Sequence, residues 1–175
     1  MHRDLQDERV GVLFVCLGNI CRSPMAEAVF QRMVEQRNLE DYIICDSAGT
    51  GDYHIGSLPH PGTLRILEIA GIRTSHRARQ ISLTDFTAFH HILVMDRDNL
   101  RDTLMLANGP ADVQLIMNYG TVLTGSDVPD PYFDGRFDTV YEMVSDACAG
   151  FLDRLELQIR ATETVNEPAN GCSRT

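Results

Sequence analysis

The sequence predicts an α/β fold, a parallel sheet of four strands with helices on both faces, in a single domain. Three observations predict it. Short apolar runs alternate with longer segments whose apolar residues recur every three or four positions, which is typical of strand–helix units. Residues that favour turns separate most of these segments. The 175 residues are 43% hydrophobic and 23% charged, as in ordinary globular proteins, and contain no internal repeat.

Four segments are expected to form the strands. Each is short and rich in Val, Ile or Leu, as buried strands are. They span Val10–Val15, Tyr42–Cys45, His91–Met95 and Val113–Met117. The second is followed by Asp46-Ser47-Ala48-Gly49, which we expect to form a turn because Asp, Ser and Gly are turn residues.

Five segments are expected to be helical. They span Pro24–Arg37, Thr63–Ala70, Ser82–Phe89, Arg97–Leu106 and Phe137–Ala161. Ser23 precedes a proline and is therefore expected to cap the first helix. Gly71 is expected to end the second helix as its C′ residue. The segment between Asn118 and Arg136 is expected to be a long loop.

Composition limits where the protein acts and what it binds. Residues 1–9 are predicted to be a polar leader that is no signal peptide, residues 10–161 the domain, and residues 162–175 a loose tail. No apolar run approaches the roughly 20 residues of a membrane span, so no membrane association is expected and the cytoplasm is the expected location. The net charge of −10 argues against nucleic-acid binding, which needs a basic surface.

The five cysteines are odd in number and scattered along the chain. This does not resemble a secreted disulfide framework, and no paired spacing indicates a zinc site. We therefore expect a reducing compartment, no bound metal and no cofactor. Cys45 and Cys148 lie on faces that are predicted to be buried, whereas Cys172 lies in the predicted tail.

The most informative stretch lies where the first strand ends and the first helix begins. It reads Cys16-Leu17-Gly18-Asn19-Ile20-Cys21-Arg22-Ser23-Pro24. A thiol facing backbone amides and a helix start is favoured as a thiolate, the form that attacks phosphorus.

The other residue types of this stretch suit the same chemistry. Gly18 and Asn19 tolerate left-handed backbone angles, so successive amides can turn inward to bind an anion. Arg22 offers a planar fork for two phosphoryl oxygens. Ser23 can donate its hydroxyl to the sulfur. Chance Cys-x5-Arg matches are common, but these additional residues between a strand and a helix make the functional interpretation the stronger one. A nucleotide-binding P-loop is excluded because no Gly-Lys-Ser/Thr is present.

This stretch resembles the signature of the low-molecular-weight protein tyrosine phosphatases. The resemblance continues in order through four further segments and so covers nearly the whole chain from Val10 to about Leu155. These segments are Asp46–Gly49, Gly71–Gln80, Met95–Leu100 and Asp130–Tyr132. The family implies a strand order of 2-1-3-4. It also implies metal-independent hydrolysis of phosphotyrosine, a phosphoric monoester, through a cysteinyl-phosphate.

The resemblance also implies roles for residues far from the cysteine. Asp130, before Pro131 and Tyr132, matches the general acid and base; without the family, a simple turn is the favoured interpretation. Asn19, Ser47 and His76 resemble a network that supports the loop, although His76 is otherwise as readily an exposed polar residue. Asp96 matches a family aspartate, and a helix N-cap role is equally reasonable. The whole predicted loop set is Leu17, Gly18, Asn19, Ile20, Cys21, Ser23, Ser47 and His76.

The resemblance places an aromatic wall around the substrate ring. Tyr53 and Tyr132 flank the ring and Leu17 lies on the floor-side loop; Phe133 stands where the family often has a second tyrosine. Ordinary loop aromatics are the alternative interpretation. Phosphotyrosine-containing proteins are the expected partners, with a tyrosine kinase among the candidates, and the protein is expected to be a monomer or to self-associate weakly.

Three further hypotheses remain at this point. Cys21 is either a resolving thiol that forms a reversible disulfide with oxidised Cys16, or a packed neutral thiol. A thioredoxin-coupled arsenate reductase of the same fold is disfavoured, because no cysteine lies between Cys45 and Cys148 to form a redox relay. A phosphotyrosine-binding module without turnover is disfavoured because Cys16, Arg22 and Asp130 are all present.

Overall fold

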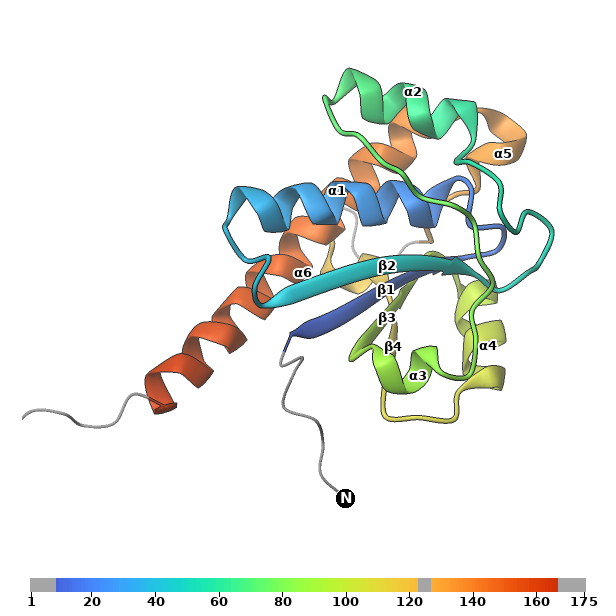
Figure 1. The fold of residues 1–175 in the computed structure, drawn as a ribbon. Coiled ribbons are helices and arrows are strands. Elements are labelled where there is room, and N and C mark those ends of the chain that lie inside the picture. Colours follow the sequence, from blue (N-terminus) through green and yellow to red (C-terminus); the bar gives the residue numbers. More distant parts are fainter. Residues whose placement is uncertain (1–8, 123–126, 167–175) are drawn as a thin grey trace, which may run out of the picture.

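A computed structural model describes residues 9–122 and 127–166 and confirms the predicted fold class. One parallel sheet holds four strands in the order β2-β1-β3-β4 (Figure 1). The strands are β1 (Val10–Cys16), β2 (Ile43–Gly49), β3 (His91–Val94) and β4 (Asp112–Leu115). The order reverses at β1, so the carboxyl end of β1 is the switch point at which α/β sheets bind ligands.

Strand β1 is the centre of the sheet. Residues 11–16 are all buried, because β2 and β3 flank the strand and helices cover both of its faces. Its last residue, Cys16, pairs in register with Gly49, the last residue of β2. The thiol therefore lies where the central strand leaves the sheet.

Helices cover the two faces of the sheet, and each face has its own apolar core (Figure 1). Helices α1, α2 and α6 pack on one face around Phe14, Phe30 and Phe151. Helices α3 and α4 pack on the other around Leu13, Phe86 and further apolar residues. The helices are α1 (Arg22–Gln36), α2 (Pro61–Ile69), α3 (Asp85–Ala88), α4 (Arg97–Leu106), α5 (Pro131–Asp134) and α6 (Phe137–Asn166), with a 3₁₀ turn η1 (Ile116–Tyr119).

Helix α1 begins two residues earlier than predicted, and Ser23 is therefore not its cap. The residue before the helix is Cys21, which makes no side-chain cap bond. Ser23 lies in the first turn, and its hydroxyl is used by the loop that precedes the helix. Pro24 still fits, because the N–H groups of a first turn have no partner within the helix.

Strand β2 is longer than predicted, and the expected turn at 46–49 is wrong. These residues continue the strand because they pair in register with residues 13–16 of β1. Backbone pairing thus outweighs the turn preference of Asp, Ser and Gly. Gly71 does end α2 as predicted: its φ is +70°, and Ile72 N donates to Leu67 O at 2.8 Å, as in a Schellman motif.

Helix boundaries in the second half differ in smaller ways. The predicted loop 118–136 contains α5 and the end of η1, while α3 is shorter than predicted; α4 has the predicted limits. Helix α6 continues to Asn166, past the predicted end at Ala161. The tail after residue 166 and the leader before residue 9 lie outside the described residues. None of the described helices is both long and apolar enough to span a bilayer.

Candidate active site

A loop of residues 16–22, called here the Cys16 loop, connects β1 to α1 and surrounds a buried sulfur. The Cys16 side chain is only 2% exposed. Its Sγ accepts a hydrogen bond from the backbone N–H of Asn19 at 3.3 Å. The hydroxyl of Ser23 lies 3.0 Å from the same sulfur. Both groups can donate to the sulfur, and such donors stabilise negative charge on it.

Four carbonyl groups of the Cys16 loop accept hydrogen bonds from segments outside it. These bonds fix the backbone of the loop, as a main-chain anion site requires. Thr50 N donates to Cys16 O and Gly51 N donates to Leu17 O, both at 2.9 Å. His60 N donates to Ile20 O at 2.7 Å, and Thr63 Oγ1 donates to Cys21 O at 3.1 Å.

Asn19 holds the loop in shape. Its φ of 54° is left-handed, a conformation that Asn adopts more readily than most residues. Its Oδ1 accepts a hydrogen bond from Arg79 N at 2.9 Å and lies 3.0 Å from His76 Nε2. Its Nδ2 donates to the hydroxyls of Ser23 and Ser47, both at 2.9 Å. The buried amide is therefore bonded at both ends, which fixes the backbone that carries it.

A side chain at Gly18 would crowd His54, and the backbone at Gly18 is not left-handed. Gly18 is not among the described glycines with a positive φ. A Cβ at this position would lie 3.0 Å from Cδ2 of His54. The predicted conformational role therefore applies to Asn19, while Gly18 allows His54 to pack against the Cys16 loop.

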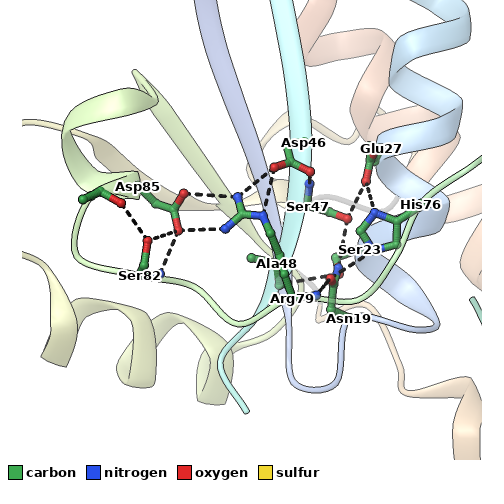
Figure 2. Close-up of polar contacts among 11 residues, drawn as sticks. Asn19, Ser23, Glu27, Asp46, Ser47, Ala48, His76, Arg79, Ser82 and Asp85 are labelled. Carbon is green, nitrogen blue, oxygen red and sulfur yellow. Dashed lines mark hydrogen bonds and ion pairs between the residues drawn. The ribbon is translucent and has the colours of Figure 1, made fainter. Parts of the chain in front are cut away.

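A buried polar network continues behind the loop (Figure 2). Ser47 donates its hydroxyl to Glu27 Oε2 at 2.5 Å, and His76 Nδ1 lies 3.0 Å from the same oxygen. His76 is 8% exposed, so the alternative of an exposed surface histidine is wrong. The chain of contacts runs from Glu27 through Ser47 and His76 to Asn19, and so reaches the loop around the sulfur.

Arg22 is buried beside the sulfur and is held by acidic groups. Its Nη1 donates to Asp96 Oδ2 at 2.5 Å and to Val128 O at 3.2 Å, and its Nη2 donates to Asp130 Oδ2 at 3.1 Å. Burial by itself lowers the pKa of Arg22, but the charges of Cys16, Asp130 and Asp96 raise it above its usual value. Within the described residues, the buried Nε has no acceptor. A buried cationic donor in this position suits an anionic ligand.

Asp130 and Asp96 reach Arg22 from different elements. Asp130 is also the N-cap of α5, because its Oδ1 accepts a hydrogen bond from Tyr132 N at 3.1 Å. Asp96 caps α4 by accepting from Asn99 N at 2.7 Å. The N-cap alternative for Asp96 is therefore confirmed, and its other oxygen accepts a hydrogen bond from Arg22. Asp130 joins the Cys16 loop to residues 130–134, which we call the acid loop.

The predicted aromatic residues are exposed, but their contacts differ from the expected pair. Tyr132 is 52% exposed, and its ring lies 5.3 Å from Phe133, 5.8 Å from His60 and 6.4 Å from His54. Tyr53 is exposed and its ring packs over Gly51. Among the described ring contacts, none joins Tyr53 to Tyr132. Leu17 is exposed, as is Phe133.

Cys21 and Cys148 are buried, and Cys45 is partly buried. Burial, and then the charge of Cys16, raises the pKa of Cys21 to about 12, so Cys21 is a neutral thiol near pH 7. Burial also raises the pKa of Cys45 and of Cys148. The prediction of a buried face is confirmed for Cys148, which belongs to the core, whereas Cys45 is only partly buried and packs against that core.

Glu27, Asp46 and His76 each place one potential metal-ligand atom within 4.8 Å of the others. They also line a cavity of about 600 Å³ between α1 and residues 71–77. Each is already bonded, however: Glu27 to Ser47 and His76, and Asp46 to Arg79 Nε at 2.9 Å. The guanidinium next to Asp46 repels a cation, so the arrangement suits a structural network better than a metal site.

Four members of this network, Glu27, Asp46, Arg79 and Asp85, were not predicted from the sequence as site residues. Glu27 lies four residues after Ser23, on the same face of α1, and that spacing is the signal that identifies it. Arg79 links Asp46 to Asp85, and its Nη1 donates to Asp85 Oδ2 at 3.0 Å (Figure 2). Burial alone raises the pKa of Asp85, but hydrogen bonds from Arg79 and Ser82 outweigh it and hold the pKa below its usual value.

Comparison with known proteins identifies similar chains. A profile described as low molecular weight phosphotyrosine protein phosphatase matches residues 11–161. The chain is 40% identical over 150 residues to the low molecular weight protein-tyrosine-phosphatase YfkJ of Bacillus subtilis, covering 84% of this chain and 96% of the relative. It is 41% identical over 150 residues to the low molecular weight phosphotyrosine protein phosphatase of Sus scrofa, covering 82% and 94%. The crystal structure of YfkJ matches with a TM-score of 0.82 and 39% identity, covering 86% and 96%.

Proposed function

We propose a catalytic assignment for this chain, which belongs to the low molecular weight phosphotyrosine protein phosphatase family. The chain is a hydrolase that removes phosphate from phosphotyrosine. In our assignment Cys16 is the nucleophile, Arg22 binds the phosphoryl oxygens and Asp130 is the general acid and base. The observation that carries the assignment is the buried Cys16 sulfur, with Asn19 N–H and the Ser23 hydroxyl directed at it and Arg22 beside it.

In the first step, the Cys16 thiolate attacks phosphorus and the bond from phosphorus to the phenolic oxygen breaks. The departing phenolate takes a proton from Asp130, because a leaving group with a pKa of about 10 is expelled slowly without one. Arg22 and the amides of the Cys16 loop stabilise the charge on the phosphoryl oxygens. In this structure Arg22 donates a hydrogen bond to Asp130. When the substrate binds, its phosphoryl oxygens accept part of the hydrogen bonding that Arg22 otherwise directs to Asp130.

In the second step, Asp130 is ionised and accepts a proton from water while the water oxygen attacks phosphorus. The bond between sulfur and phosphorus breaks, inorganic phosphate is released and Cys16 returns as a thiolate. Ser23 supports this departure, since its hydroxyl is 3.0 Å from the sulfur. Asn19 keeps both the hydroxyl and the loop amide in place. Side chains and amides of this chain supply each of these roles.

Burial of the nucleophile supports a preference for phosphotyrosine over phosphoserine. Cys16 is only 2% exposed, whereas the side chains predicted to contact the substrate ring, Leu17, Tyr53, Tyr132 and Phe133, are all exposed. A phosphate must therefore be carried on a long side chain to reach the sulfur. The exposed aromatic rings suit contact with an aromatic substrate ring. Phosphotyrosine-containing proteins are the proposed partners, and the need for a reduced nucleophile supports a cytoplasmic location.

The experiment compares phosphate release from matched phosphotyrosine and phosphoserine peptides. We expect turnover of the phosphotyrosine peptide alone, unchanged by a chelator, and none by Cys16→Ser. The replacement should still bind inorganic phosphate, since Arg22 and the loop amides remain. Turnover by Cys16→Ser would refute the nucleophile assignment. Turnover of both peptides at similar rates would refute the preference for phosphotyrosine inferred from the burial of Cys16.

A further inference from the structure

His60 lies between the Cys16 loop and helix α2. Its backbone N–H donates to Ile20 O of the Cys16 loop at 2.7 Å. Its ring Nδ1 accepts a hydrogen bond from Gly62 N at 3.0 Å and so caps α2. The two bonds fix the backbone and the ring orientation of His60 relative to the loop that carries the nucleophile.

The ring of His60 faces the segment that carries the general acid. It stacks on Phe137, the first residue of α6, with centroids 4.9 Å apart and planes inclined by 16°. It meets Tyr132 of the acid loop edge-on at 5.8 Å. A Cβ at Gly62 would lie 2.4 Å from the Phe137 ring, so the approach of α2 to Phe137 requires a glycine there. Figure 1 shows α2, α5 and the start of α6 at the same end of the molecule.

Tyr132 connects this contact to Asp130. The carboxylate of Asp130 accepts the backbone N–H of Tyr132 at 3.1 Å, so a shift of Tyr132 displaces the acid. Phe133 also touches Tyr132, but it is 84% exposed and belongs to the same short turn, so it does not anchor the acid loop to other elements. His54 is more distant, at 6.4 Å, which leaves His60 as the closer ring from outside the acid loop.

We propose that His60 is a positioning residue that aligns Asp130 with the phosphoryl group held in the Cys16 loop. His60 bonds to the Cys16 loop and packs against the acid loop, so it sets the distance between these two loops. The proposal rests on the roles assigned to Cys16 and Asp130 above. A displacement of about 1 Å at a catalytic group is enough to reduce a rate by orders of magnitude.

Two variants separate positioning from helix capping. His60→Asn keeps a side-chain acceptor for the start of α2, because Asn is a good N-cap, but removes the ring. His60→Phe keeps a ring and removes the acceptor. We expect His60→Asn to lower kcat/KM, which reports the first step, about tenfold for phenyl phosphate, whose phenolate needs a proton, and little for aryl phosphates with strongly electron-withdrawing substituents. We expect His60→Phe to keep the wild-type ratio of the two rates while its Tm falls.

A matched control lies at the other end of β1. The Nδ1 of His90 also accepts a backbone N–H, from Gly11 at 3.0 Å, but the ring is remote from the site. His90→Asn should leave the ratio of the two rates at the wild-type value. Asp130→Ala, measured in parallel, should show the largest fall in that ratio.

The possible results distinguish the role of His60 from the role of Asp130. An unchanged ratio in His60→Asn, together with a reduced ratio in Asp130→Ala, would overturn the role of His60 alone. Wild-type behaviour of His60→Asn, together with a lower Tm and equal losses on both substrates in His60→Phe, would show that the residue acts only as a cap. An unchanged ratio in Asp130→Ala would overturn the assignment of the acid and this proposal with it.

Discussion

Asp130 has two contacts in the structure that bear on its catalytic role. One oxygen caps the acid loop through Tyr132 N, and the other bonds to the guanidinium of Arg22. The first fixes the carboxylate relative to α5, and the second brings it next to the phosphate-binding group. Both contacts therefore hold Asp130 close to the group that is proposed to bind the phosphoryl oxygens.

Asp130→Ala should therefore slow the enzyme according to the leaving group. For a phenolate that needs protonation we expect a loss of about 10²–10⁴ in kcat/KM, the usual contribution of a general acid. For a very good leaving group the loss of kcat/KM should be small, because the first step then needs no proton. Steady-state kinetics over a series of substituted aryl phosphates measures this, and a uniform loss of kcat/KM across the series would contradict the role.

Cys16 and Cys21 lie in one loop but should differ sharply in reactivity. The pKa of Cys21 is raised to about 12 by burial and by the charge of Cys16, so at pH 7 Cys21 is protonated and unreactive. We expect iodoacetate at pH 7 to modify Cys16 first, with inorganic phosphate giving protection. Peptide mass spectrometry locates the label, and modification of Cys21 before Cys16 would contradict this assignment.

Helices and strands with strong periodicity were predictable from sequence, whereas their ends were not. The start of α4 lies where it was predicted, because Asp96 supplies a local cap there. The turn expected at 46–49 does not form, because these residues pair with β1 residues that lie thirty-three positions earlier in the chain. Local turn preference contains no information about that pairing. Ser23 was expected to cap α1, but its hydroxyl is used by the buried sulfur instead.

The same distinction applies to the site. Cys16, Asn19 and Arg22 lie in one contiguous loop, so their proximity follows from sequence. Arg79 and Asp85 were missed because their contacts depend on how residues 77–85 cross the end of β2, where Gly49 N donates to Arg79 O at 2.8 Å. Long-range packing sets that crossing, and sequence spacing carries no signal for it.

The bridge between Arg79 and Asp85 should make stability depend on pH. The folded pKa of Asp85 is below its unfolded value, so its contribution is fully present above about pH 4 and is lost as pH falls through the folded pKa. Asp85→Asn should lose about 1–3 kcal/mol of unfolding free energy at pH 7 and less at low pH.

Urea unfolding at both pH values measures the difference, with Asp98→Asn as the control on an exposed carboxylate whose side chain is 79% exposed. A gap between Asp85→Asn and wild type that widens in acid would contradict the assigned ion pair.

Across the molecule, one aromatic cluster joins the central strand to two helices. The rings of Phe14 in β1 and Phe30 in α1 lie 5.4 Å apart, and Phe30 and Phe151 in α6 lie 5.9 Å apart. All three side chains are at most 1% exposed. The Cys16 loop connects β1 to α1. The aromatic cluster therefore holds in place the two elements to which the loop is attached.

Phe30→Ala should destabilise the fold by about 3–5 kcal/mol, through lost apolar contact and the cavity left behind. Met105→Ala is the surface control, because Met105 is 80% exposed, and it should change stability by less than about 0.5 kcal/mol. Denaturant unfolding compares them. Equal stability of the two variants would contradict the position of Phe30 at the centre of the core.

The central claim is that the phosphoryl group passes through the sulfur of Cys16. Asp130→Ala should slow the hydrolysis of that intermediate, so we would mix this variant with a rapidly reacting aryl phosphate, quench in acid and map the peptides by mass spectrometry. We expect phosphate on the peptide that contains Cys16. Turnover with no phosphate on Cys16, or with phosphate on another residue, would contradict it.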